Sequence, residues 1–236
     1  MNTPSGYRRE APGCHPAYDC REYASTHKRA PSRPPVRLEQ TLSEITGPHP
    51  GAELIGPVAA DMSRYGGGEA IGERIIVCGR VLDEDGRPLP DTLVELWQAN
   101  AAGRYAHAVD QHDAPLDSHF SGVGRVLTNQ AGVYRFLTIR PGAYPWRNHK
   151  NAWRPRHIHF SLFGPGFATR LVTQMYFPGD PLLALDPILN SVPDAAARER
   201  LISVFDMELS QSEYALGYRF DLVLRGSDAT PMEVDT

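Results

Sequence analysis

Short β-branched runs separated by turn signals begin at Arg74 and continue to about residue 226, and they limit the possible folds more than any other feature of the sequence. The clearest of them read RIIVCGRVLD, TLVELWQA, HIHFSLF, TRLVTQMYF and GYRFDLVLRG. Runs of this kind, bounded by Gly, Pro, Asn and Asp, are typical of the strands of an all-β sandwich or barrel. We therefore predict an all-β core over residues 73–226.

Two turns and one helix can be placed along this core. The segment DEDGRPLP, with Asp85 and Gly86 at its tip, predicts a hairpin between the first two runs. A second turn, from Asn129 to Gly132, separates GRVLTN from VYRFLTI. The stretch SVPDAAARERLISVF is the one good helical candidate, because Pro193 and Asp194 can open a short helix before its Ala-rich turns.

Residues 1–72 have a different texture. The sequences APSRPP, ITGPHPG and RYGGGEAIG interrupt this segment and leave room for a short helix or two at most. We predict an irregular N-terminal arm over residues 1–72, followed by one domain over residues 73–236 with a short C-terminal tail. A Pro-rich segment of this length can bury little of itself, so we expect it to lie across the core or across another chain.

Charge and cysteine content exclude several functions. The chain has 24 Lys and Arg against 28 Asp and Glu, which provides no basic footprint for nucleic acid. No apolar run approaches the ~18 residues that span a bilayer, and the first residues lack the apolar stretch of a signal peptide, so we expect a cytoplasmic protein. Cys14, Cys20 and Cys78 are an odd number without a CxxC pair, which fits neither a disulfide framework nor a thiolate zinc site.

The His157-Ile158-His159 sequence is the first candidate for chemistry. Side chains alternate along a strand, so the two imidazoles project from one face and could bind one metal ion, or could simply be polar residues on a solvated face. No histidine of the chain is followed by a carboxylate as in HxD or HxE, which argues against an iron(II) facial triad. The first Glu after His159 is Glu199, too distant for a cupin site. HExxH and GxSxG motifs are also absent from the sequence.

Two tyrosines could complete a metal site. Tyr105 follows TLVELWQA after a short Gly-containing link, and Tyr144 lies in PGAYPWRN, a stiff loop. A phenolate is a hard anionic donor suited to iron(III), and coordination would depress its pKa far below ~10. Either tyrosine could instead pack with its hydroxyl on a backbone partner. A second metal site at His107, His112 and His119 is a weaker possibility, because these residues lie in a loop.

Three longer segments carry a resemblance to a known family: GRVLDEDGRPLPDTLVELWQANAAGRYAH, PGAYPWRN and WRPRHIHFSLFGPG. They resemble the intradiol ring-cleaving dioxygenases that use non-haem iron(III), and the similarity extends from about residue 40 to residue 226. IGERIIVCGRV and YRFDLVLRG resemble the protocatechuate branch of that family, and Tyr23, Arg29 and Pro31 keep the spacing of its N-terminal arm. The resemblance implies an antiparallel β-sandwich with the site on its loops and one strand.

The resemblance also implies a role for individual residues. It makes Tyr105, Tyr144, His157 and His159 the ligands of one non-haem Fe(3+) per chain, with Tyr144 as the axial ligand that leaves the metal when substrate binds. It places five residues around the substrate: Tyr23, Trp146, Arg154, Gln174 and Ile188. Arg154 would offset negative charge that builds on the substrate, and Gln174 would orient it. Trp97 and Trp153 are expected to serve packing.

The implied reaction is cleavage of protocatechuate by O2 to 3-carboxy-cis,cis-muconate, a step of aromatic catabolism. The implied partner is a homologous alpha chain that shares the active site in a hetero-oligomer. Two alternatives remain at this stage. The same chemistry could act on catechol, hydroxyquinol or a chlorocatechol, although those relatives usually carry a helical N-terminal segment that this Pro-rich arm lacks. The chain could also be a non-catalytic sandwich subunit, although the complete ligand set argues against that.

Overall fold

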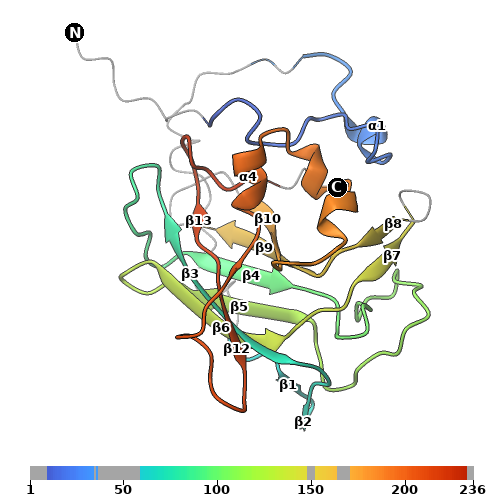
Figure 1. Ribbon diagram of the computed structural model, residues 1–236, viewed down its shortest axis with the longest axis vertical. Coiled ribbons are helices and arrows are strands. Elements are labelled where there is room, and N and C mark those ends of the chain that lie inside the picture. The colour runs from blue at the N-terminus through green and yellow to red at the C-terminus, as the bar shows by residue number, and fades with distance from the viewer. Residues whose placement is uncertain (1–9, 35, 37–58, 148–151, 164–170, 233–236) are drawn as a thin grey trace.

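Two β-sheets packed face to face form the body of the computed structural model, which describes residues 10–34, 36, 59–147, 152–163 and 171–232 (Figure 1). The first sheet is antiparallel throughout, in the order β10-β9-β4-β5. Its strands are β10 (Leu171–Tyr176), β9 (His157–Phe163), β4 (Leu93–Trp97) and β5 (Val123–Leu127).

The second sheet is built around the long strand β3 (Arg74–Leu82). β6 (Val133–Ile139) pairs with β3 antiparallel, whereas β12 (Leu216–Arg219) and β13 (Leu222–Val223) pair with it in parallel, and β11 (Val204–Phe205) pairs with β12. The predicted all-β sandwich is therefore confirmed. It is mainly antiparallel, and the two parallel pairs arise because the C-terminal segment returns along β3.

The hydrophobic core lies between the two sheets. Val77 of β3, Phe136 of β6, and Ile158 and Phe160 of β9 are all at most 1% exposed and belong to one cluster. Each buried side chain of this size contributes roughly 1.5–3 kcal/mol relative to exposure. Since β9 alternates, the same strand that anchors the core directs His157 and His159 to its other face, as the sequence predicts.

The predicted hairpin between RIIVCGRVLD and TLVELWQA is wrong. The local turn forms: the backbone N–H of Asp83 donates to the carbonyl of Arg87, and Leu82 pairs with Pro88 across the turn. The chain then turns again at Asp91, whose φ is +53°, and β4 enters the opposite sheet instead of pairing with β3. The turn residues specify a reversal of direction, but they do not specify which sheet receives the next strand.

The second predicted turn is present and has the same property. Asn129 accepts a backbone hydrogen bond from Gly132 at 2.8 Å, and Gly132 adopts a φ of +67°. The strands on either side, β5 and β6, belong to different sheets. Both connections thus run between the two layers of the sandwich.

Short elements surround the sheets. The hairpins are β1 (Arg64–Tyr65) with β2 (Gly68–Glu69), and β7 (Tyr144–Trp146) with β8 (Ala152–Arg154). The helical turns are α1 (Thr26–Arg29), η1 (Leu183–Leu185), η2 (Leu189–Ser191) and α4 (Ala195–Glu199). The predicted helix is confirmed in α4: the side chain of Asp194 caps it by accepting from the backbone N–H groups of Ala196 and Ala197.

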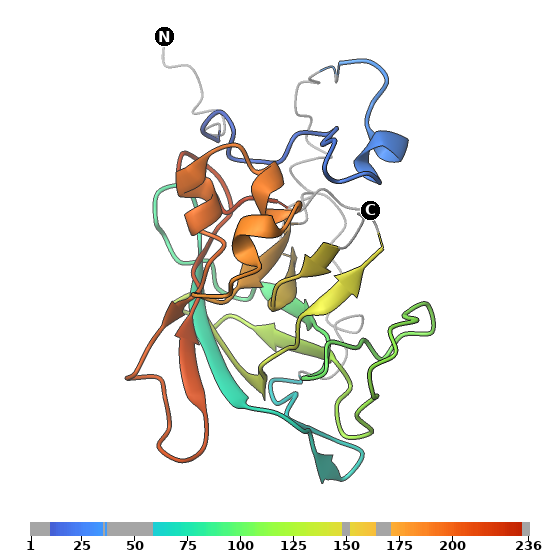
Figure 2. The ribbon, with the colours of Figure 1, turned by 45° about the vertical axis from the view of Figure 1, so that its right-hand side comes forward.

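The N-terminal segment 10–34, blue in Figures 1 and 2, lies across the orange segment that carries η1, η2 and α4. Asp194 donates its backbone N–H to the carbonyl of Gly13 at 3.1 Å. The Cys14 thiol donates to the carbonyl of Ala229, and the ring of His15 accepts from the backbone N–H of Met232. These contacts fix the described part of the arm to the C-terminal half of the chain.

Residues 59–62 also pair with the sandwich, through Ala59 with Arg125 and Asp61 with Leu137. Residues 37–58 of the predicted arm lie outside the described residues, and the predicted boundary at residue 72 stays a prediction. Cys14, Cys20 and Cys78 are free thiols. Within the described parts of the chain, every helix is too short to cross a membrane.

Candidate metal centre

Two imidazoles on the outer face of β9 form the centre of the site. His157 is 2% exposed and its ring lies 4.8 Å from that of His159. The Nδ1 atom of His157 is 2.7 Å from the carbonyl oxygen of Pro155, which fixes Nδ1 as the protonated nitrogen and leaves the lone pair on Nε2. Burial, together with the positive charge of Arg154, holds the pKa of His157 well below its ordinary value, so the ring is neutral as a metal ligand must be.

A compact loop after β4 positions Tyr105. The side-chain oxygen of Asn100 accepts from the backbone N–H groups of Ala102 and Arg104, both at 3.0 Å. Asp110 then accepts from the N–H of Tyr105 at 2.8 Å. Two polar side chains thus hold the backbone amides from Ala102 to Tyr105, which restricts where the phenol ring can point.

The loop that carries Tyr144 is pressed against the Tyr105 loop. Gly142 donates its N–H to the carbonyl of Asn100 at 2.9 Å. A Cβ atom added to Gly103 would lie 2.1 Å from the carbonyl oxygen of Ala143, and one added to Gly142 would lie 2.5 Å from that of Ala101. Only glycine permits this approach of the two backbones, so the two loops place their tyrosines side by side.

Four aromatic side chains meet at one place as a result. The Tyr144 hydroxyl is 3.2 Å from Nε2 of His157. The ring of Tyr105 is 5.4 Å from that of Tyr144 and 6.4 Å from that of His159. The structure therefore brings together all four residues that the sequence nominates as metal ligands. Their coordination of a metal remains a prediction.

The donor set fits iron(III) better than a softer metal. Among the described residues, no group of three or more His, Cys, Asp and Glu side chains is arranged to hold a metal ion. A metal site here must therefore use phenolate oxygen. Two imidazoles and two phenolates match a hard trivalent cation, because anionic oxygen donors stabilise high charge. The same observation argues against the second metal site considered at His107, His112 and His119.

Three of the predicted substrate residues are in contact with one another. The guanidinium of Arg154 lies 5.8 Å from the ring of Trp146, and Trp146 lies edge-on to Tyr23 at 5.0 Å. The guanidinium of Arg29 lies over the ring of Tyr23, 4.8 Å from its centre. All three guanidinium nitrogens of Arg29 are buried, and none has a hydrogen-bond partner among the residues that the structure describes.

Gln174 and Ile188 lie on the same side of the site. Gln174 of β10 is 3% exposed and stands opposite His159 in the strand register. Ile188 precedes η2 and lines two small cavities of about 10 Å³ each, one shared with Gln174 and one with Tyr23. Gln174 thus lies beside the four-ring cluster, and the two cavities link Ile188 to Gln174 and to Tyr23.

The two tryptophans expected to serve packing behave differently. Trp97 stacks on His159, with ring centres 4.7 Å apart and planes 7° from parallel, so it fixes the orientation of a candidate ligand. Trp153 is 47% exposed and packs its ring edge-on against His112, at the surface of the protein. It lies in β8, a strand of a two-stranded sheet with little to cover its outer side.

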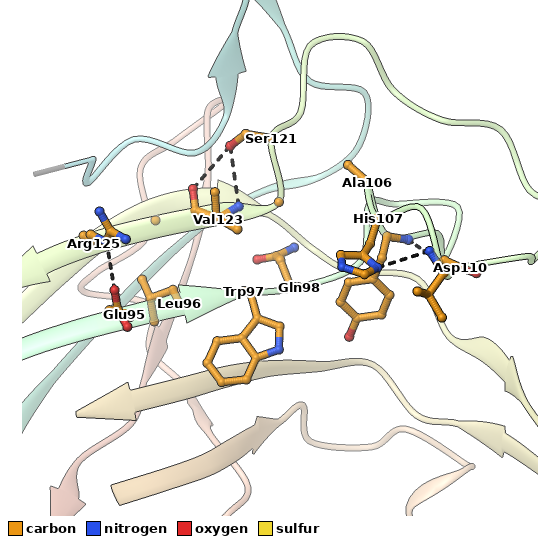
Figure 3. Close-up of a pocket in the computed structure, with 14 residues that line it drawn as sticks. Glu95, Leu96, Trp97, Gln98, Ala106, His107, Asp110, Ser121, Val123 and Arg125 are labelled. Carbon is orange, nitrogen blue, oxygen red and sulfur yellow. Dashed lines mark hydrogen bonds and ion pairs between the residues drawn. The ribbon is translucent and has the colours of Figure 1, made fainter. Parts of the chain in front are cut away.

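A pocket of about 680 Å³ opens beside this cluster and is drawn in Figure 3. Trp97 and the Glu95–Arg125 ion pair line it from the sheet, and His107 and Asp110 line it from the loop. Of the four candidate metal ligands and the five predicted substrate residues, Tyr105 alone is among its lining residues. The pocket therefore borders the candidate metal centre at Tyr105, and none of the predicted substrate residues lines it.

Sequence reasoning missed Tyr176 and Asp186, which contact Arg154. The phenol of Tyr176 lies 3.1 Å from the guanidinium of Arg154, and Asp186 forms a buried ion pair with it. Tyr176 could have been found by strand alternation, since it is two residues after Gln174 and shares its face. Asp186 has no such signal, because it lies in an irregular segment.

The sandwich fold and the four-residue site agree with the family that the comparisons with known proteins identify. The chain belongs to the intradiol ring-cleaving dioxygenase family: residues 45–226 match the family described as Dioxygenase, and residues 7–41 match the N-terminal region of protocatechuate 3,4-dioxygenase beta subunits. The resemblance read from the sequence is confirmed.

Particular relatives are similar over most of their length. The chain is 61% identical to the protocatechuate 3,4-dioxygenase beta chain of Burkholderia cepacia, over 93% of this chain and 94% of that one. It is 31% identical to the alpha chain of that enzyme from Pseudomonas putida, over 82% and 95%. Among solved structures, 3-chlorocatechol 1,2-dioxygenase from Rhodococcus opacus 1CP matches with a TM-score of 0.56 and 27% identity, over 78% and 72%.

Proposed function

We propose that this chain is the iron-bearing beta chain of an enzyme that cleaves protocatechuate with O2 between its two hydroxylated carbons, giving 3-carboxy-cis,cis-muconate. The observation that carries the proposal is the meeting of Tyr105, Tyr144, His157 and His159 at one point of the sandwich. Similarity to the Burkholderia cepacia beta chain supports the choice of substrate.

The four side chains would hold one Fe(3+). Bound there, the ion would withdraw electron density from a chelated catechol ring and make it reactive toward O2. The protein contributes the orientation of the donors: Pro155 fixes the tautomer of His157, Trp97 stacks on His159, and the glycine contact holds the two tyrosine loops together.

Arg154 and Gln174 would act on the substrate itself. Arg154 is permanently charged and only 2% exposed, so its guanidinium can stabilise negative charge that develops on the ring without competition from water. Gln174 stands beside His159 in the register and can orient the ring through its amide. Ile188 would close the apolar side of the same space.

Arg29 supports a carboxylated substrate over plain catechol. Burying guanidinium nitrogens without hydrogen bonds is costly, and those of Arg29 find none among the described residues, which favours an anionic ligand there. Arg29 contacts Tyr23, and Tyr23 contacts Trp146, so Arg29 of the arm is connected to the predicted substrate residues. The carboxylate of protocatechuate would provide the missing charge, with the Tyr23 hydroxyl as a second donor.

A homologous alpha chain would complete the pocket. The curated relatives include alpha chains that share this fold family, and the alpha chain of Pseudomonas putida aligns over most of its length. We propose a hetero-oligomer in which the arm of the beta chain and residues of the alpha chain together enclose the substrate carboxylate.

The direct test is O2 consumption by the chain coexpressed with the alpha chain of its host, with protocatechuate, catechol, hydroxyquinol and a chlorocatechol as substrates. We expect protocatechuate to have the highest kcat/KM and the product to be the ring-opened 3-carboxy-cis,cis-muconate. A higher kcat/KM for catechol or hydroxyquinol would show that this compound, and not protocatechuate, is the preferred substrate. Absence of turnover with every catechol, in protein that contains iron, would contradict the enzymatic role.

Arg29→Met tests the carboxylate site separately. It keeps an unbranched stem that can still pack on Tyr23 and removes the charge, so kcat/KM for protocatechuate should fall by about 10- to 100-fold, the range for a hydrogen bond to a charged group. Turnover of catechol, which lacks the carboxylate, should change much less. Lys28→Met, at an exposed neighbouring position of α1, is the matched control. Equal losses for both substrates would remove Arg29 from substrate recognition.

A further inference from the structure

A buried polar network joins two predicted substrate residues to two residues with no assigned role. Arg154 ends β8, Gln174 and Tyr176 lie in β10, and Asp186 directly follows η1. The exposed fraction of each residue is 3% or less. The four residues come from three separate segments, so tertiary folding alone brings them together.

Asp186 is the centre of this network. Its Oδ1 atom accepts from Nε of Arg154 at 2.9 Å, and its Oδ2 atom lies 3.0 Å from the hydroxyl of Tyr176. The backbone N–H of Leu189 donates to the same Oδ2 at 3.2 Å. A carboxylate with this many donors is held in one orientation, and it holds the guanidinium plane of Arg154 in turn.

The network also fixes the orientation of the Gln174 amide. Nη2 of Arg154 donates to Oε1 of Gln174, and the Tyr176 hydroxyl is 2.9 Å from the same oxygen. Because a guanidinium has donors only, the amide oxygen must face Arg154 and the amide nitrogen must face away. That nitrogen, Nε2, is buried and has no hydrogen-bond partner among the described residues.

Leaving a buried amide N–H without a partner is unfavourable, and the cost is recovered if a ligand supplies an acceptor. Gln174 stands opposite His159, so the acceptor would belong to a molecule bound beside the candidate metal centre. The orientation of this donor depends on Arg154, and the orientation of Arg154 depends on Asp186.

We propose that Asp186 is a positioning residue for the reaction: through its ion pair with Arg154 and its contact with Tyr176, it aims the guanidinium of Arg154 and the Nε2 donor of Gln174 at the substrate ring. The inference rests on the proposed function of the site. Charge on the ring develops after binding, so the misplacement of these donors should lower kcat more than it raises KM.

Asp186→Asn tests the inference in the coexpressed alpha–beta enzyme. The change keeps the size of the side chain and removes the charge that orients Arg154. We expect kcat for protocatechuate to fall by at least about tenfold, the scale reported for residues that orient a site from behind its ligands. Iron content and the KM should stay close to wild type. Glu84→Gln is the matched control: it breaks the ion pair between Glu84 and Arg225, which is outside the Asp186 network, and it should leave kcat unchanged.

Tyr176→Phe covers the case in which Asp186→Asn does not fold. It removes only the hydroxyl between Asp186 and Gln174, and a smaller loss of kcat with normal iron content is expected. A non-activity readout is the affinity for a monohydroxybenzoate, an uncleavable analogue, measured by calorimetry, together with the enthalpy of that binding. In both variants the Gln174 amide should be misplaced and should lose its hydrogen bond to the analogue. The binding enthalpy of the analogue should therefore be less favourable than in the wild type.

The outcomes separate the two proposals. If both variants retain kcat and binding enthalpy, the positioning role is overturned. If Asp186→Asn loses iron in proportion to activity, the residue is structural and the proposal is also overturned. If the wild-type enzyme does not cleave protocatechuate but the variants still alter analogue binding, the substrate assignment fails and the positioning role stands.

Discussion

At the scale of single residues, the candidate site depends on how neighbouring side chains and backbone groups orient the two histidines. Burial and the positive charge of Arg154 hold the pKa of His157 well below its ordinary value, and its hydrogen bond to Pro155 fixes the orientation of the ring, which lies within 3.2 Å of the Tyr144 hydroxyl. His159 is held by the stacking of Trp97. Each candidate donor thus has a neighbour that orients it, which is what a preformed metal site requires.

Replacement of either histidine by alanine should remove iron. Both imidazoles lie on one strand, and among the described residues no group of three or more His, Cys, Asp and Glu side chains could hold the ion in their place. We expect metal affinity to fall by at least about 100-fold and activity to fall with it. Metal analysis of the purified variants measures this, with His112→Ala in the adjacent loop as control. Near-stoichiometric iron in both variants would exclude the pair as ligands.

At the scale of elements, the sequence predicts strands well and their partners poorly. Strand periodicity located β9 and the shared face of His157 and His159, and capping chemistry located α4 at Asp194. It failed for β3 and β4, because a turn motif reports only the reversal of the chain, whereas the sheet that each strand joins is decided by packing across the core. Asp186 was missed for a similar reason, since only tertiary structure brings it to Arg154.

The contact between the two tyrosine loops provides a prediction at this scale. In Gly103→Ala, the new methyl group meets the carbonyl oxygen of Ala143 and the residue must keep a φ of +80°. Unfolding free energy should fall by about 1–3 kcal/mol, with partial loss of iron, because the loops separate. Gly86→Ala is a matched control, since Gly86 has a φ of +76° but open space around it. It should lose less stability and no iron, and similar iron losses in both variants would contradict the account.

At the scale of the whole molecule, the N-terminal arm connects the C-terminal segment to the candidate site. Its described part is fixed to the C-terminal segment through Gly13, Cys14 and His15, and it carries Tyr23 and Arg29 toward the candidate site. The arm therefore contributes to the candidate substrate pocket and also covers the helical segment beside it.

Coexpression with the alpha chain should determine how complete this pocket is. We expect this chain alone to be poorly active or to aggregate, and the alpha–beta complex to cleave protocatechuate in preference to catechol. Size-exclusion chromatography with O2 uptake on the same fractions measures both properties. Full, protocatechuate-selective turnover by a homo-oligomer of this chain would refute the shared pocket while leaving the metal site intact.

The visible absorption spectrum tests the central claim, an Fe(3+) site with two tyrosinate ligands, most directly. The purified wild-type protein should be red-brown from tyrosinate-to-iron(III) charge transfer, and Tyr105→Phe and Tyr144→Phe should each shift or weaken that band in a different way. A colourless protein that contains stoichiometric iron, or a band that is unchanged in both variants, would contradict the account.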